Sequence, residues 1–327
     1  MWPASFWEKY EYFIRHSAGL GKSPTSNDPD IYDHRNIHCD VLVVGAGISG
    51  ILAAKNAANN NYKTLLLDEK NELGGSTIYE NNESNKIDNK ISSEWLKKEI
   101  EELKNIKNLE IKTRTSVAAY HQYNYLLARE NLTDHLEKKD KTNKIRQRLL
   151  KIRAKKVILA TGALERPMVF NNNDRPGIML SSAIKKYSDF YGVACGRKIV
   201  FFTNNDSAYE SALSLNDKGI KVEAVVDIRK QSETNLEKRV INAGIKIYWE
   251  HTVVDTSGYK RLNNVSIMKL SNDGTSVTGN KISISCDCLG IAGGWTPAVH
   301  LYTQSGRKLA FDEDKKIFIP NKNNSDQ

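Results

Sequence analysis

The chain has 327 residues, a formal net charge of +9 and four cysteines, which is enough length for two domains with hydrophobic cores of their own. No run of about eighteen apolar residues occurs, which excludes a transmembrane helix. The N-terminus contains acidic residues early and lacks an apolar h-region, which argues against a secretory signal. No C-x-x-C pair is present, which argues against a thioredoxin-type redox centre and a zinc ribbon. We therefore expect a reduced, cytoplasmic protein without a metal site.

The positive charge does not by itself identify a partner. The lysines are scattered among Asn and Glu, and no basic helix or aromatic-interleaved basic patch is present. We therefore attribute the charge to a composition rich in lysine and asparagine and expect neither a nucleic-acid nor a membrane partner. A polyglutamylated cofactor or an acidic subunit remains the alternative.

Aromatic side chains crowd the first 20 residues, which are expected to form a short amphipathic helix. So much apolar surface needs to be covered, either by this chain's own body, which is the main expectation, or by a partner. Residues 21–37 are polar and contain proline, so they predict an extended connector. The aromatic residues are Trp2, Phe6, Trp7, Tyr10, Tyr12 and Phe13.

Residues 39–68 carry the pattern on which the functional prediction depends. An apolar run at 41–44 predicts a strand buried on both faces of a parallel sheet. Gly45, Gly47 and Gly50 follow with G-x-G-x-x-G spacing and lead into a helix with small residues on its packing face. The first glycine permits the tight turn, the second lets a pyrophosphate approach, and the third lets helix and strand pack closely. The N–H groups of the helix start would face the phosphates.

A second apolar strand is expected at 64–67, and Asp68 ends it, 18 positions after Gly50. A carboxylate there accepts hydrogen bonds from the adenosine ribose and disfavours a 2′-phosphate, so the pattern favours NAD or FAD over NADP. The alternative is a glycine-rich turn that binds no ligand. Gly74 and Gly75 then lie where two-dinucleotide flavoproteins carry a second glycine pair close to the phosphates.

The elements that follow complete a first dinucleotide-binding domain. A helix at 92–104 is expected to be capped by Ser92, and Val117 is the candidate for contact with the adenine. A buried strand ending in Thr161-Gly162 is a second signature of the same architecture. The remaining strands are predicted at 109–113, 116–120, 123–130, 146–154 and 156–160, with a solvated, charged turn at 137–141.

A second β-α-β unit is predicted from a strand at 198–202, a helix at 207–215 and a strand at 222–227. The loop at 203–208 has no glycine, so its side chains would obstruct a pyrophosphate and Asp206 would repel it. We therefore expect a Rossmann-like domain without tight nucleotide binding.

The C-terminal part is expected to return to the first cofactor. A helix is predicted at 233–243, and strands at 246–249, 265–270 and 282–292; Cys286 and Cys288 on the last are expected to share one face as core thiols. Thr296 is the expected N-cap of a helix with Pro297 at its first position. His300 is expected to be packed rather than catalytic, and the tail after Pro320 has the composition of a disordered segment.

Together these features predict an α/β protein with two Rossmann-type FAD/NAD(P)-binding domains, like pyridine nucleotide-disulfide reductases, built on a parallel sheet with a small antiparallel layer. The expected organisation is an aromatic helix and connector at 1–37, a first domain at 38–172 plus 281–327, and an inserted second domain at 173–280.

Five stretches together resemble the alpha subunit of heterotetrameric sarcosine oxidase. They are WPASFWEKYEYFIRHSAGLGKSP, HCDVLVVGAGISG, ATGALERPMVFNNNDRPGIMLSSA, FFTNNDSAYESAL and IAGGWTPAVHLYTQSGRKL. The resemblance implies NAD in the first site, FAD on a beta-type flavoprotein subunit, FMN at the interface with that subunit, and smaller further subunits. It also implies oxidative demethylation of sarcosine with tetrahydrofolate and O2.

The resemblance and the motifs give one set of candidate cofactor-binding residues, and no catalytic residue or metal ligand. The set is Gly45, Ala46, Gly47, Ile48, Ser49, Gly50, Asp68, Glu69, Lys70, Gly74, Gly75, Ser76, Val117, Thr161, Gly162, Gly294, Thr296, Leu301 and Thr303.

The family's alpha subunits are far longer than this chain, with an upstream ferredoxin-like region and a downstream folate-binding domain that the sequence does not contain. Folate binding is therefore assigned to no residue here, and a truncated gene, a split gene and a misplaced start remain open. The rival functions are a free-standing FAD-dependent NAD(P)H oxidoreductase and a non-catalytic remnant.

Overall fold

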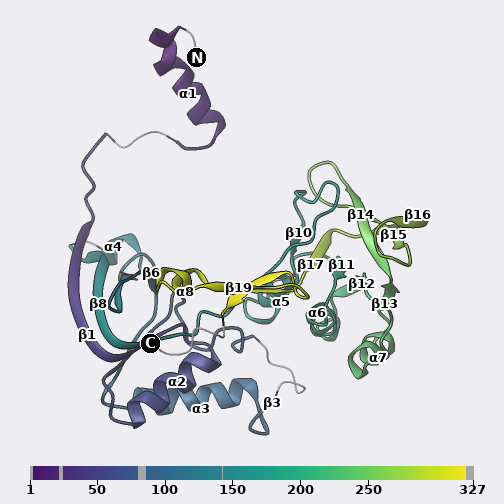
Figure 1. Ribbon diagram of the computed structural model, residues 1–327. Helices are drawn as coiled ribbons and strands as arrows, with labels where there is room; N and C mark the ends of the chain where they lie inside the picture. Colours follow the sequence, from purple (N-terminus) through teal and green to yellow (C-terminus); the bar gives the residue numbers. More distant parts are fainter. Residues whose placement is uncertain (1–2, 22–24, 80–85, 142, 322–327) are drawn as a thin grey trace. The chain divides into compact units, whose positions relative to one another are not determined.

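The computed structural model describes residues 3–21, 25–79, 86–141 and 143–321 (Figure 1). It divides into two compact units, Met1–Asp33 with Asn131–Arg148, and His34–Glu130 with Leu149–Gln327. The two units are described separately.

The first unit contains η1 (Ala4–Phe6), α1 (Trp7–Ser17) and the short α4 (Lys138–Lys141). No residue of α1 is buried within this unit, and Trp7 and Phe13 are 54% and 68% exposed; Trp2 lies outside the described residues. The charged stretch expected to be a turn forms α4. Arg146 pairs with Asp30 and with Asp134.

The second unit begins with a six-stranded sheet in the order β5-β2-β1-β8-β7-β6. Its parallel part is β1 (Ile31–Val44), β2 (Thr64–Leu67) and β5 (Leu109–Lys112). The others are β6 (Thr115–His121), β7 (Tyr125–Asn131) and β8 (Ile145–Leu159), with β6 antiparallel to β7. β8 is one long strand where two were predicted, and β1 extends into the expected connector.

Apolar clusters lie on both faces of this sheet. On one face lie α2 (Ile48–Asn59) and α3 (Ser92–Lys104) (Figure 1). The cluster on this face buries Ile51, Leu66 and Leu103. On the other face, Leu42 and Leu65 pack against Leu126, Leu150 and Ile152 of β7 and β8 of the same sheet. Ser92 begins α3 but is not its cap, because the N-cap position is Ile91. A small hairpin, β3 (Lys86–Ile87) with β4 (Lys90–Ile91), precedes α3.

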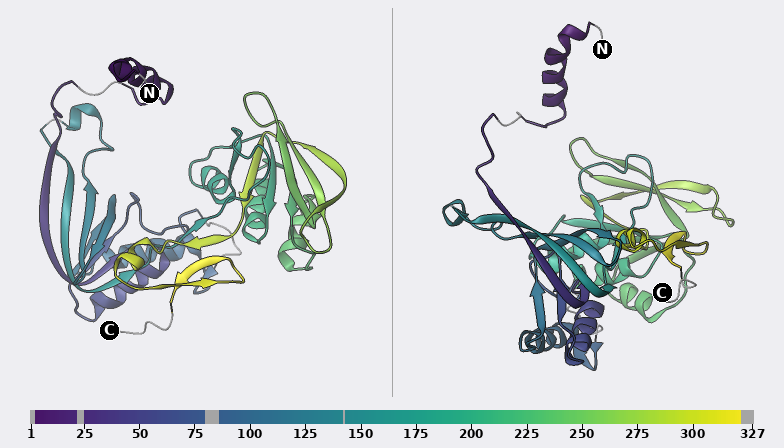
Figure 2. Two further views of the ribbon diagram at one scale, coloured as in Figure 1. Left: turned by 45° about the horizontal axis from the view of Figure 1, so that its top comes forward. Right: turned by 60° about the vertical axis from the view of Figure 1, so that its left-hand side comes forward.

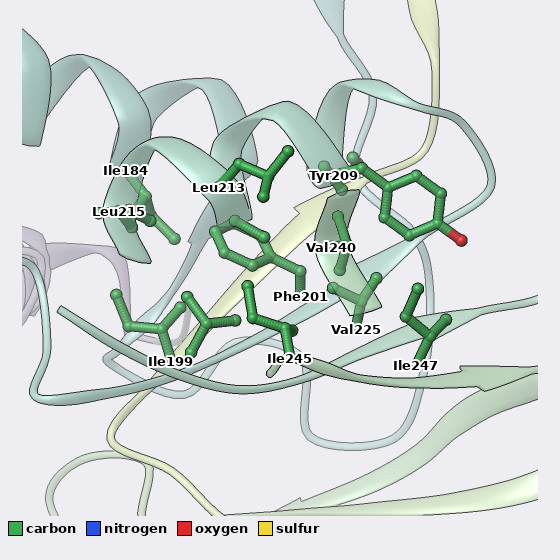
Figure 3. Packing of buried hydrophobic residues seen from close by; sticks show 14 of the residues in the cluster. Ile184, Ile199, Phe201, Tyr209, Leu213, Leu215, Val225, Val240, Ile245 and Ile247 are labelled. Atoms are coloured by element: carbon green, nitrogen blue, oxygen red, sulfur yellow. The ribbon is translucent and has the colours of Figure 1, made fainter. Parts of the chain in front are cut away.

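A second sheet has the order β10-β17-β11-β12-β13, and every pairing in it is parallel. Phe201 and Tyr209 are fully buried in the core that this sheet forms with its helices (Figure 3). The strands are β10 (Ile178–Leu180), β11 (Lys198–Thr203), β12 (Lys221–Asp227), β13 (Lys246–Trp249) and β17 (Cys288–Ala292); the helices are α5 (Ser181–Asp189), α6 (Ser207–Asp217) and α7 (Asn235–Asn242).

An antiparallel sheet of β14 (His251–Ser257), β15 (Asn264–Leu270) and β16 (Val277–Ser285) lies beside these strands (Figure 2). Its Val253, Val265 and Ile267 pack against Val200 and Phe202 of β11. The second sheet is therefore covered on both faces, as its parallel strands require.

The single strand predicted at 282–292 is wrong, because the chain breaks into β16 and β17 at Cys286-Asp287. The Asp287 carboxylate accepts the backbone N–H groups of Arg197 and Lys198, both at 2.9 Å, and holds this break. β17 consequently pairs in the second sheet, which differs from the assignment of residues 281–327 to the first domain. The two cysteines are buried core thiols as expected, but they belong to different clusters on either side of the second sheet, not to one face.

The segment after β17 also differs from its prediction. Thr296 and Pro297 lie in β18 (Trp295–Pro297), which pairs antiparallel with β9 (Ala163–Glu165). The helix starts later, as α8 (His300–Gln304), with Val299 at the N-cap position. A hairpin of β19 (Leu309–Asp312) and β20 (Ile317–Pro320) follows, and residues 322–327 of the predicted disordered tail lie outside the described residues.

The buried thiols give a prediction about alkaline stability. All four cysteines are free, and burial raises the pKa of Cys39 to about 11 and of Cys286 and Cys288 to about 12, from 9.0. Because the pKa values of these thiols are higher in the folded than in the unfolded chain, the neutral buried thiols contribute to the stability of the fold. This contribution is fully present below pH 9 and is lost as the pH rises towards 11–12. Each thiol should contribute up to about 1.4 kcal/mol per pH unit. Denaturant titrations at pH 8.5 and about 10.5 should show a smaller fall for Cys286→Ala than for the parent; an equal fall would contradict the assignment.

Within the described ranges, no helix has the length and apolar character needed to cross a membrane. In the same part of the chain, His, Cys, Asp and Glu side chains form no group of three that could hold a metal ion.

Candidate functional site

A cavity of about 1220 Å³ lies along the carboxyl ends of the first sheet. Asp68 follows β2, Gly45 follows β1, and Ala160 to Gly162 follow β8; these strands are neighbours in the order β2-β1-β8. The ends of β1 and β8 meet, because the Ala160 N–H donates to the Val44 carbonyl at 2.8 Å. Open α/β sheets bind ligands at this edge.

The glycines of the β1–α2 turn have different structural roles. Gly45 has φ +97°, and a Cβ on it would lie 2.3 Å from the Ala160 carbonyl oxygen. A Cβ on Gly50 would lie 1.8 Å from the Gly45 carbonyl oxygen, so both positions are fixed by packing. Gly47, the N-cap of α2, has nothing within 4 Å of an added Cβ. The fold therefore does not require glycine at 47, and the space beside it belongs to the cavity.

The start of α2 presents hydrogen-bond donors to this space. Ile48 and Ser49 line the cavity with Ala46 and Gly47, and the first N–H groups of a helix have no intrahelical acceptor. Their partial positive charge suits a phosphate. The arrangement can therefore hold a diphosphate without any cationic side chain.

Asp68 fastens this turn to β2. It is 8% exposed, and its Oδ2 accepts the Ala46 N–H at 2.6 Å while Oδ1 accepts the Lys70 N–H at 2.8 Å. Each carboxylate oxygen keeps a further lone pair, so Asp68 can still accept a ribose hydroxyl from the cavity that it lines. Glu69 is exposed beside it and lines the same cavity, together with Lys70.

The second glycine pair lies against the first. The Gly74 N–H donates to the Ala46 carbonyl at 2.7 Å, and a Cβ on Gly75 would lie 3.0 Å from the Gly47 Cα. Gly75, Ser76 and Val117 line the cavity as well. The sequence signal at residues 73–76 thus lies spatially beside the turn at residues 45–47.

On the other side of the cavity, the loop after β8 is joined to the segment before α8. Thr161 Oγ1 donates to the Ala298 carbonyl at 2.8 Å, and the Ala298 N–H donates to the Gly162 carbonyl at 3.0 Å. Thr161, Gly162 and Leu301, all candidate cofactor-binding residues, line the cavity. Four candidates are not among its lining residues, namely Gly50, Gly294, Thr296 and Thr303.

Sequence reasoning missed the wall that the second sheet's helices supply. Ser182 and Lys185 of α5 and Ser207, Glu210 and Ser211 of α6 line the same cavity. Spacings of three and four residues place each set on one helix face, but nothing in the sequence indicates that these faces meet the first sheet's edge. Leu164 of β9 and Trp295 of β18 line it too, 60% and 41% exposed.

The corresponding edge of the second sheet is filled by its own side chains. The Asn205 Oδ1 accepts the Ser207 N–H at 3.1 Å at the start of α6. Arg229 bridges Asp206 and Asp227, each at 2.8 Å, and the Tyr209 hydroxyl donates to Asp227 at 2.7 Å.

Burial, and then the hydrogen bond to Asp227, raise the pKa of Tyr209 above its ordinary value, so its hydroxyl remains a donor. The network is self-contained, and the loop has the side chains predicted to exclude a pyrophosphate.

Curated relatives resemble the whole chain. Sarcosine oxidase subunit alpha of Corynebacterium sp. (strain P-1) is 39% identical over 304 residues, which cover 92% of this chain and 31% of that protein. The same subunit of Rhizobium meliloti (strain 1021) is 35% identical over 320 residues, covering 98% and 31%. The resemblance stated from the motifs is confirmed, and the chain spans under a third of these relatives' length.

Solved structures show the same fold. Thioredoxin reductase of T. acidophilum has a TM-score of 0.64 at 21% identity, covering 84% of this chain and 83% of that one. L-proline dehydrogenase from P. horikoshii has a TM-score of 0.62 at 22% identity, covering 88% and 48%. The predicted fold class is confirmed. Residues 39–325 match the family described as pyridine nucleotide-disulphide oxidoreductase, and the chain therefore belongs to this family of FAD/NAD(P)-binding oxidoreductases.

Proposed function

We propose that the chain binds one NAD in the cavity at the first sheet and is the nucleotide-binding part of a sarcosine oxidase-type oxidoreductase. The observation that carries the proposal is the contrast between Gly47 and its neighbours. Gly45 and Gly50 are required by packing, whereas Gly47 borders open space that a Cβ would fill. A dinucleotide diphosphate on the start of α2 explains why that space is kept open.

The chain's residues would act by holding the cofactor. The N–H groups of Ile48 and Ser49 would bind the diphosphate, and Asp68, with Glu69 beside it, would accept the adenosine ribose. NAD, when bound, supplies hydride-transfer capacity. His300, which was expected to be packed, is exposed and lines the cavity. We assign no catalytic role to any lining residue, and the chain would bind and orient the cofactor.

Partners are part of the proposal. The relatives are named subunits, and we propose that this chain joins a beta-type flavoprotein and smaller subunits, with an FMN at the flavoprotein interface. The complex would oxidatively demethylate sarcosine with tetrahydrofolate and O2. The isolated chain would be inactive.

Cofactor release tests the proposal directly. Denaturing the purified chain and identifying the released nucleotide by mass spectrometry should give one NAD per chain. If the chain is purified without nucleotide, titration with NAD should show one molecule bound per chain. Released FAD would support the rival flavin oxidoreductase, whose purified chain would be yellow and oxidise NADH alone. Occupancy of the second sheet's edge with the first cavity empty would overturn the proposal.

A further inference from the structure

The helices α5 and α6 of the second sheet form one wall of the cavity. The half of a bound dinucleotide that is distant from the adenosine would reach this wall. Following the sheet order, the cavity passes from Asp68 at the end of β2 to Gly47 beside β1, and then to Thr161 after β8. β8 continues almost directly into β9, whose Leu164 lines the cavity with α5. With the ribose at Asp68 and the diphosphate at Gly47, the second sugar and ring are directed past β8 towards α5.

Lys185 is the cation on this wall. It is 6% exposed, and its Nζ lies 3.0 Å from Asp189 Oδ2 and donates to the Tyr79 carbonyl at 3.0 Å. An ammonium has three N–H donors, and the described residues offer the third no oxygen or nitrogen acceptor; the Tyr79 ring lies 5.8 Å from Nζ. A buried donor without a full hydrogen-bond acceptor is costly, and Lys185 lines the cavity.

The wall is held in place without a ligand. The Glu165 Oε2 accepts the Ser182 N–H at 2.9 Å, which joins β9 to the first turn of α5. The Ser181 hydroxyl donates to the Ser211 hydroxyl at 2.9 Å, which joins α5 to α6. Asp189 is shared with Lys218 and accepts the Ser214 hydroxyl, so the position of Lys185 is fixed by packing and by two acceptors. Such pre-organisation lowers the entropy cost of a contact.

We propose that Lys185 donates its third N–H to an oxygen of the dinucleotide's distal half, the second sugar and ring, so that α5 is part of the cofactor site. This inference rests on the proposed function. Sugar hydroxyls and ring carbonyl or carboxamide oxygens are the acceptors that this half offers, and Asp189, which Lys185 shares with Lys218, offsets part of the charge of Lys185.

Calorimetric titration with NAD⁺ and with ADP tests the contact, because ADP shares the adenosine and diphosphate but lacks the distal half. The variants are Lys185→Met and the control Lys186→Met. Lys186 lies on the same helix and is not among the lining residues; its Nζ lies near the Tyr79 ring. Lys185→Met should raise the Kd for NAD⁺ about tenfold or more and leave the Kd for ADP within about twofold. Lys186→Met should change neither.

An equal loss of affinity for NAD⁺ and ADP would mean that Lys185 acts only through the Tyr79 segment. No loss of affinity for either ligand would mean that Lys185 does not contact the nucleotide. Either result overturns the inference. Retained ADP binding shows that a variant is folded. If the Lys185→Met protein does not fold, Lys185→Gln, which keeps a donor for the Tyr79 carbonyl, is used in its place. Wild-type protein that binds neither ligand would instead refute the proposed function. For wild type that retains FAD, FAD replaces NAD⁺ in the same comparison.

Discussion

Gly47→Val should lower the affinity for the dinucleotide at least about a hundredfold, or about 2.8 kcal/mol, while leaving the fold intact. The side chain would enter the space beside the start of α2, where nothing lies within 4 Å of its Cβ. The cost to folding should be up to about 1 kcal/mol, because glycine is a better N-cap than an apolar residue. Calorimetric titration with NAD⁺ and thermal unfolding measure the two effects separately.

Gly50→Ala is the matched control, because it should destabilise the fold, which Gly47→Val should leave intact. Its methyl group would lie 1.8 Å from the Gly45 carbonyl oxygen, so backbone must move, at a cost of about 3 kcal/mol of unfolding free energy. Loss of stability with Gly47→Val as large as with Gly50→Ala would show that Gly47 is a packing residue. Unchanged NAD⁺ affinity in a folded Gly47→Val protein would place the diphosphate elsewhere.

Asp227→Ala should destabilise the chain by about 3 kcal/mol. Asp227 is 1% exposed and accepts the Tyr209 hydroxyl at 2.7 Å, the Arg229 N–H at 2.8 Å and the Arg229 guanidinium at 2.8 Å. Its removal leaves a buried hydroxyl and a partly buried cation without their acceptor. We expect a loss of unfolding free energy at the lower end of the values for removing one partner of a buried ion pair. The reason is that Arg229 is 36% exposed and keeps its ion pair with Asp206. Urea unfolding measures the change.

Asp206→Asn is the control for this network. Asp206 is 54% exposed, and exposed pairs contribute about 1 kcal/mol or less, so its urea midpoint should hardly move. Neither variant should change NAD⁺ affinity in the first cavity at temperatures where it is folded. Equal effects of the two substitutions would show that Arg229 and Tyr209 do not depend on Asp227.

The sequence determined what depends on local pattern. Apolar runs and small-residue spacing gave β2, α3 and the β11–α6–β12 unit within a few residues, because periodicity and turn chemistry act over short distances. The glycine turn, Asp68 and Thr161-Gly162 were predicted for the same reason, and the structure brings them to one cavity.

Tertiary structure alone decided where separate pieces meet. One apolar run became β16 and β17 in different sheets, because Asp287 is held by the backbone of residues 197–198, about 90 positions away. Thr296-Pro297 has the composition of a helix start but lies in β18, because pairing with β9 outweighs capping preference. Lys185 and Ser182 carry no motif, and they line the cavity only because α5 is joined to β9 through Glu165. Local propensities are worth a few tenths of a kcal/mol to about 1 kcal/mol per residue, and long-range pairing and burial exceed them where the two disagree.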